Sequence, residues 1–70
     1  MRTVEVETEY IKLDSLLKLA VFAQSGGEAK FLIQEGMVLV NGLPCLERGK
    51  KIRAGDIVLV SGEEIIVLRK

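Results

Sequence analysis

Apolar and acidic residues alternate at the start of the chain. A repeat of two predicts a half-buried strand, because successive side chains of a strand point to opposite faces. The side chains that would point inward along residues 3–11 are Val4, Val6, Thr8 and Tyr10. Glutamates occupy positions between them, so we expect this strand to have an acidic outer face.

Further along, apolar residues recur every three or four positions, which is typical of an amphipathic helix. The residues of this stripe are Leu13, Leu16, Leu17 and Ala20. Asp14 would lie in the first turn, where a carboxylate interacts favourably with the helix dipole. Leu19 and Val21 lie off the stripe, and we expect them to contact a second layer of the fold.

A second helix is predicted over residues 27–35. Ser25 and Glu28 have the spacing of a capping box, in which each side chain bonds to the main-chain amide of the other residue. Gly36 follows the helix, as a left-handed cap would. The residues of its apolar face are Ala29, Leu32 and Ile33.

The rest of the chain predicts four more strands. Asn41-Gly42 is a strong hairpin signal after residues 37–40, and Pro44 restricts the returning strand to a sheet edge. Residues 57–60 and 65–69 are apolar runs separated by turn residues. The expected order is β-α-α-β-β-β-β, an α+β fold in which two short helices pack on a small, mostly antiparallel sheet.

The composition indicates one small domain, to which we assign residues 1–70. Folding buries only roughly 60% of the surface that an unfolded chain of this size exposes, so the core has to be well formed. Cys45 is the only cysteine and histidine is absent, so we expect no disulfide, no metal site and no cofactor. No apolar run is long enough for a membrane span or a signal peptide, and an unpaired thiol suits the cytoplasm.

The formal charge is zero, but the charges are unevenly distributed. The first 11 residues carry one base and three acids, residues 12–53 seven bases and four acids, and residues 54–70 two bases and three acids. Four of the ten basic residues lie close together, at Arg48, Lys50, Lys51 and Arg53. Such a local concentration of positive charge attracts a polyanion even where the net charge is zero. Taken alone, it fits equally a solvated turn whose lysines maintain solubility.

The outward face of the second helix would extend this positive surface. Lys30, Phe31 and Gln34 lie opposite its apolar side, and its first turn offers the free amides of Gly26 and Gly27. Helix N-termini attract phosphate, and glycine permits the close approach of a backbone. A cation, amide donors and an aromatic ring together suit contact with RNA, although we interpret Phe31 as a core or rim residue rather than a stacking platform.

Catalytic groups are not apparent in the chain. Without histidine, general acid–base catalysis would depend on carboxylates. Each of the four candidates has a structural explanation at a helix end, a cap or a turn, and these are Asp14, Glu28, Glu35 and Asp56. We therefore expect that the protein is not an enzyme.

Three ordered stretches, "IKLDSLLKLA", "SGGEAKFLIQEGMVLVNG" and "KIRAGDIVLV", resemble the S-four type RNA-binding domain, also called the alpha-L motif. The resemblance covers about residues 11–60, and the double glycine and short chain look most like its stand-alone bacterial, YaaA-like branch. It implies that structured RNA binds in a groove between the two helices and the hairpin. Ribosomal RNA, transfer RNA or a small regulatory RNA would all suit such a groove, and of these we expect ribosomal or transfer RNA.

The resemblance also implies particular RNA contacts. By position, these are Lys12, Asp14, Ser25, Lys30, Gln34 and Asn41, with the basic residues of 48–53 reaching the phosphates. Lys12 and Gly26 stand where many family members have arginine, so the basic residues of 48–53 would carry more of the binding. We expect those basic residues to lie beside the first turn of the second helix, so that both meet the same phosphate backbone.

Other functions are consistent with parts of the sequence. Met37 and Leu39 would face away from Val38 and Val40, and an exposed apolar surface there would indicate a protein partner or a weak dimer. An accessory role beside an RNA-modifying or ribosome-associated protein also fits. A ubiquitin-like sulfur carrier shares the "VNG…GD" pattern, but such a carrier needs a C-terminal Gly-Gly and this chain ends "VLRK".

Overall fold

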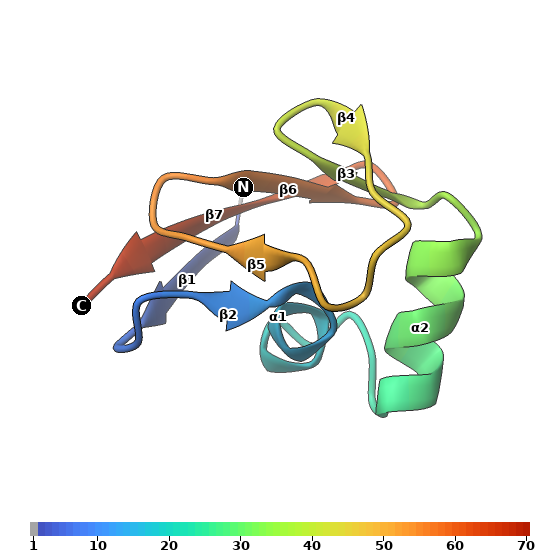
Figure 1. Ribbon diagram of the computed structural model, residues 1–70, viewed down its shortest axis with the longest axis horizontal. Helices are drawn as coiled ribbons and strands as arrows, with labels where there is room; N and C mark the ends of the chain where they lie inside the picture. The colour runs from blue at the N-terminus through green and yellow to red at the C-terminus, as the bar shows by residue number, and fades with distance from the viewer. Residues whose placement is uncertain (1) are drawn as a thin grey trace.

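The computed structural model describes residues 2–70, with a five-stranded sheet, a two-stranded sheet and two helices (Figure 1). In spatial order the strands of the larger sheet are β1 (Arg2–Val6), β7 (Glu63–Arg69), β6 (Ile57–Val60), β3 (Val38–Val40) and β4 (Leu43–Pro44). β1 runs parallel to β7, and the other neighbouring pairs are antiparallel. The predicted α+β fold with a mostly antiparallel sheet is confirmed. Met1, the first residue of the predicted domain, lies outside the described residues.

The smaller sheet was not predicted. It pairs β2 (Ile11–Lys12) with β5 (Lys51–Ile52) in an antiparallel arrangement. The helices α1 (Leu13–Leu19) and α2 (Gly26–Gln34) follow β2, and Figure 1 shows them together on one side of the larger sheet. The run of basic residues at positions 48–53, for which no strand was predicted, therefore contains one.

The first strand is shorter than predicted. β1 ends at Val6, so Thr8 and Tyr10 do not point inward along it: Thr8 is exposed and Tyr10 is half-buried. The ladder stops because its partner stops, since β7 ends at Arg69, opposite Val6. The Thr8 hydroxyl donates to the Tyr10 carbonyl at 2.7 Å, within the turn that leads the chain to β2.

The apolar stripe predicted for the first helix is the buried face of α1. Its three leucines, Leu13, Leu16 and Leu17, are fully buried. Leu19 and Val21, expected to contact a second layer, are instead 56% and 75% exposed. That expectation was wrong because this side of α1 faces solvent, and Val21 lies in the turn after the helix with a φ of 65°.

The ends of α2 are formed as the sequence predicts, with one difference. The Ser25 hydroxyl accepts the Glu28 amide at 3.1 Å, but the Glu28 carboxylate accepts from the Gln24 amide at 3.3 Å, one residue earlier than in a capping box. At the other end Gly36 has a φ of 77°, and its amide bonds to the Ile33 carbonyl at 3.2 Å. This positive φ is a conformation that glycine adopts without steric cost.

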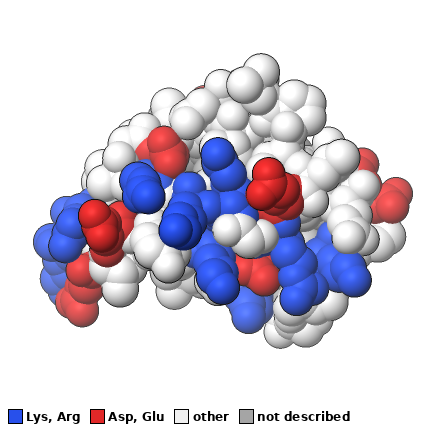
Figure 2. Space-filling view, in the orientation of Figure 1, with Lys and Arg blue, Asp and Glu red and all other residues white. Residues whose placement is uncertain are grey.

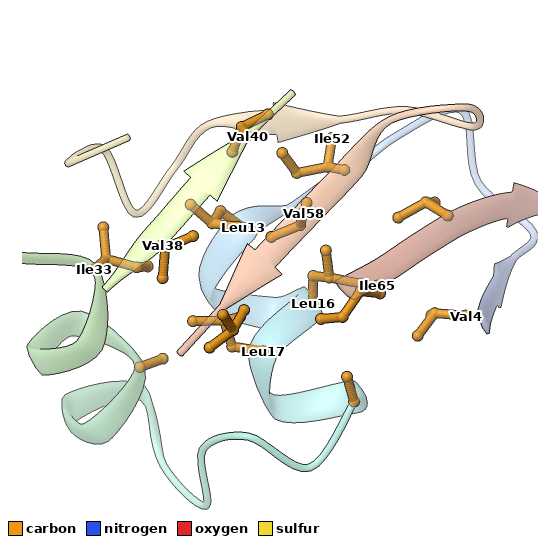
Figure 3. Packing of buried hydrophobic residues seen from close by; sticks show 14 of the residues in the cluster. Val4, Leu13, Leu16, Leu17, Ile33, Val38, Val40, Ile52, Val58 and Ile65 are labelled. Atoms are coloured by element: carbon orange, nitrogen blue, oxygen red, sulfur yellow. The ribbon is translucent and has the colours of Figure 1, made fainter. Parts of the chain in front are cut away.

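The core lies between the helices and the inner face of the larger sheet (Figure 3). Its large, fully buried side chains are Leu13, Leu16, Leu17, Ile33, Ile52, Ile65, Val38, Val58, Val60 and Val67. Ile52 joins this cluster from β5, within the segment that the sequence analysis considered only for its charge. The basic part of the chain is therefore anchored by a buried side chain.

The hairpin predicted at Asn41-Gly42 is present. Both residues have positive φ, 50° and 85°, which matches the type I′ turn that suits the twist of paired strands. β4 is the edge strand, as Pro44 predicts, because a proline has no amide for a further neighbour.

The outer face of the larger sheet is partly apolar. Met37 is 42% exposed and Leu39 is partly exposed, whereas Val38 and Val40 point into the core. The orientation predicted for these four side chains is confirmed.

Neither helix within residues 2–70 is long and apolar enough to cross a membrane.

Candidate nucleic-acid interface

The basic segment, defined here as residues 48–53, is fixed to the start of α1 by its main chain. The Leu13 amide donates to the Lys50 carbonyl at 2.9 Å, and the Asp14 amide donates to the Arg48 carbonyl at 3.0 Å. These two amides belong to the first turn of a helix and have no acceptor within it. The carbonyls of the basic segment replace a side-chain cap, which Lys12 does not provide.

This arrangement differs from the expected one. The helix opening that the basic segment contacts is that of α1, whereas the sequence analysis expected the first turn of α2. Figure 1 shows the start of α2 at the lower right of the molecule, while the chain before β5 passes beside α1. The error arose because charge and helix caps are local features, and neither specifies which helix a distant segment will contact.

Two lysines face each other across the small sheet. Lys12 of β2 is the register partner of Lys51 of β5, and both side chains are exposed. Like charges directly opposite one another in an antiparallel pair destabilise it. The small sheet forms despite this repulsion because the neighbouring pair is apolar. Ile52 lies within the core and Ile11 packs against it.

The protein's own carboxylates leave most of these cations free. Among residues 2–70 no carboxylate lies within 4.0 Å of the charged nitrogens of Lys12, Lys50, Lys51 or Arg53. Arg48 is the exception, since its Nε lies 3.9 Å from the Asp14 carboxylate. The resulting positive surface is shown in Figure 2, where Lys and Arg side chains gather across the middle of the face over β2, β5 and the chain before β5.

Asp14, Ser25 and Asn41, implied as RNA contacts by the family resemblance, also make hydrogen bonds within the protein. Asp14 accepts the Ser15 amide at 2.8 Å as well as facing Arg48. Ser25 caps α2. The Asn41 side chain accepts the Ile57 amide at 3.0 Å.

Asn41 also joins two turns that are distant in the sequence. Its amide nitrogen donates to the Asp56 carboxylate at 3.1 Å, and the same carboxylate accepts the Arg53 amide at 2.8 Å. The β3–β4 hairpin is thus tied to the turn before β6. The "VNG" and "GD" sequences of this chain therefore have a structural explanation.

The exposed face predicted for α2 is exposed in the structure. Lys30, Phe31 and Gln34 all lie on the surface, and Phe31 is 59% exposed. A Cβ added to Gly26 would find no neighbour within 4 Å, and one added to Gly27 would meet only the Ser25 hydroxyl at 3.9 Å. Internal packing therefore does not require glycine at either position.

Tyr10 belongs to the basic surface, although the sequence analysis assigned it to the inner face of a strand. Its ring centroid lies 5.0 Å from Lys51 Nζ and 5.8 Å from the guanidinium carbon of Arg53. These distances are within the range of cation–π interactions. The residue was missed because its contacts come from residues about forty positions away, and the local alternation around it suggested a longer strand.

Comparison with known proteins identifies relatives over most of the chain. The family model described as S4 domain matches residues 4–68, a longer stretch than the residues 11–60 of the resemblance. A probable ribosome maturation protein, RlbA, of Bacillus subtilis (strain 168) is 46% identical over 59 residues, which cover 84% of this chain and 83% of the relative. A putative RNA-binding protein, YbcJ, of Escherichia coli (strain K12) is 37% identical over 59 residues, covering 84% of each chain.

The fold is also similar to a solved structure. The solution structure of YbcJ from E. coli, described as revealing an αL motif involved in RNA binding, matches with a TM-score of 0.75 and 35% identity. The match covers 97% of this chain and 87% of that chain. The sequence resemblance, the family match and the shared fold agree, and the chain therefore belongs to the S4 domain family of RNA-binding modules and has the αL fold.

Proposed function

We propose that this protein binds structured RNA through its basic face and catalyses no reaction on it. The observation that carries the proposal is the pair of like charges at Lys12 and Lys51, which are register partners across the small sheet and have no carboxylate partner among residues 2–70. A phosphate backbone would relieve this repulsion and release condensed counterions, which favours binding. The positive charges of Lys12 and Lys51 would thus destabilise the free protein but stabilise its complex with RNA.

The proposed contact surface combines the basic segment with the outward face of α2. Its members are Lys12, Gly26, Gly27, Lys30, Gln34, Arg48, Lys50, Lys51 and Arg53. Arg48 would have to exchange its contact with Asp14 for a phosphate, so we expect it to contribute less than its three basic neighbours. In this proposal Asp14, Ser25 and Asn41 maintain the shape of the surface rather than touch RNA.

We propose ribosomal RNA as the principal ligand, with transfer RNA as the other candidate. Support comes from the Bacillus subtilis relative, which is named as a probable ribosome maturation protein. Basic side chains on a small sheet and helix ends suit the shape and phosphates of folded RNA better than the edges of its bases. This function implies a location in the cytoplasm, where an unpaired Cys45 thiol would also stay reduced.

Crosslinking in cells tests this proposal. The RNA bound to the protein would be crosslinked with ultraviolet light, recovered and sequenced, for the natural chain and for a variant with Lys50, Lys51 and Arg53 replaced by alanine. We expect fragments of ribosomal RNA from the natural chain and a large loss from the variant. Recovery of no RNA above background would contradict the proposal, and recovery of transfer RNA alone would change the ligand.

A second candidate function is binding of a protein partner by the outer face of the larger sheet. Leu39, Ile57 and Leu59 line a shallow groove of about 370 Å³ there, and Ile57 is 38% exposed. Exposed apolar surface of this kind is a feature of interaction sites. Replacing Leu39 and Ile57 with serine should leave RNA binding intact if this face has a separate role.

A further inference from the structure

Tyr10 lies where two parts of the chain, the residue before β2 and residues 51–53, meet on the basic face. It precedes β2, while the cations on its ring come from β5 and from the residue that follows β5. Its side chain is half-buried, whereas Lys51 and Arg53 are exposed. A half-buried ring therefore lies close to two long, exposed side chains.

The ring attracts these cations without neutralising them. The negative face of an aromatic ring favours a nearby ammonium or guanidinium group, but it carries no net charge. A carboxylate at the same position would satisfy the cations and compete with a phosphate. Tyr10 thus restrains Lys51 and Arg53 and leaves their charge available to a ligand.

From this geometry we infer that Tyr10 is a positioning residue, which holds Lys51 and Arg53 ready for the phosphates of RNA. The inference rests on the proposed function and names the part of the RNA that this end of the surface binds: the phosphate backbone rather than a base. Immobilising a long side chain on binding costs affinity, and restraint in the free protein removes part of that cost. Loss of the ring should therefore weaken RNA binding by roughly fivefold.

A different role for Tyr10 would be to stack on a base, which aromatic side chains commonly do in RNA complexes. A base that stacked on a ring face covered by a cation would have to displace that cation, and two cations lie over this ring. The two roles also differ in their dependence on Lys51 and Arg53. A positioning residue loses its effect when the cations are removed, and a stacking residue keeps it.

A double-mutant cycle separates these roles. The dissociation constant of a fluorescein-labelled RNA stem-loop would be measured for the natural chain, Tyr10→Leu, the pair Lys51→Ala with Arg53→Ala, and all three changes together. We expect Tyr10→Leu to weaken binding roughly fivefold in the natural chain and less than about twofold when both cations are already absent. Tyr10→Phe, which keeps the ring, should bind within about twofold of the natural chain.

Control measurements show whether the variants are folded and the cations restrained. Nuclear magnetic resonance would report ring-current shifts at the side-chain methylenes of Lys51 and Arg53, expected in the natural chain and Tyr10→Phe and lost in Tyr10→Leu. Phe22→Leu is a matched control. The Phe22 ring centroid lies 4.5 Å from the guanidinium carbon of Arg2, which is not a cation of the basic segment. We expect that variant to bind RNA like the natural chain.

Several results would overturn the inference. Equal affinity of Tyr10→Leu and the natural chain would remove the positioning role while leaving the proposed function intact. An equal loss in both backgrounds would indicate base stacking. Absence of ring-current shifts would show that the cations are not held, even if Tyr10→Leu proved too unstable to assay. No binding by the natural chain to this stem-loop or to bulk ribosomal RNA would reject the proposed function together with the inference.

Discussion

Between the exposed cations Lys51 and Arg53, Ile52 is fully buried. This one side chain turns a run of charges into a positioned surface, because burying it fixes the direction in which its neighbours point. In the sequence these residues stand out only for their charge, and nothing marks Ile52 as a core residue. A single apolar residue between charges shows no repeat, so no periodicity could identify it.

Replacing Ile52 with alanine should therefore destabilise the protein. Removal of a fully buried isoleucine side chain leaves a cavity, and we expect the free energy of unfolding to fall by about 2–5 kcal/mol. Urea denaturation followed by circular dichroism measures the change. Lys50→Ala, an exposed neighbour in the same segment, is the control and should change stability by less than about 0.5 kcal/mol. A similar small effect at Ile52 would mean that the basic segment is not anchored in the core.

Lys12 is predicted to have opposite effects on stability and on binding. Lys12→Gln removes the repulsion across β2 and β5 and a positive charge at the start of α1, so the free energy of unfolding should rise by about 0.2–1 kcal/mol at low salt. The gain should shrink as salt screens the repulsion. RNA affinity should fall in the same variant. Loss of stability at low salt would show that Lys12 and Lys51 do not repel each other in the folded protein.

At the scale of the elements, local signals were sufficient for the helices and the hairpin. The stripe of leucines, the Ser25 cap, Gly36 and Asn41-Gly42 each act within a few residues of their own position. β2 and β5 could not be found in this way, because strands of two residues show no alternation and their pairing joins segments far apart in the chain. The cap of α1 by the carbonyls of the basic segment was missed for the same reason.

The first turn of α2 provides an element-scale test of the interface. Gly27→Ala adds a methyl group to a helix with only the Ser25 hydroxyl nearby, at an ordinary contact distance of 3.9 Å, so the free energy of unfolding should rise by about 0.5–1 kcal/mol. If the amides of this turn contact phosphate, the same methyl group should obstruct the approach and weaken RNA binding. Thermal unfolding and a binding titration measure the two effects. Gain in stability with unchanged affinity would remove this turn from the proposed contact surface.

At the scale of the whole molecule, the zero net charge hides a basic face. The sequence predicted that positive charge gathers between residues 12 and 53, and the family resemblance predicted the fold. Neither the sequence nor the resemblance predicted that the basic segment would be hydrogen-bonded to α1 rather than lie beside α2. Neither predicted that the ring of Tyr10 would lie against the basic segment. Both features depend on tertiary contacts that no short stretch of the chain encodes.

The salt dependence of RNA binding tests the central claim, that the cations of the basic segment bind phosphates, most directly. The slope of log K against log salt would be compared between the natural chain and the variant with Lys50, Lys51 and Arg53 replaced by alanine. Lys70→Ala is the control, because the Lys70 Nζ pairs with the Glu7 carboxylate at 3.9 Å and lies outside the basic segment. The account predicts that the triple variant lowers the magnitude of the slope by about 2 to 3, while the control leaves it unchanged. An identical slope for the triple variant and the natural chain would contradict it.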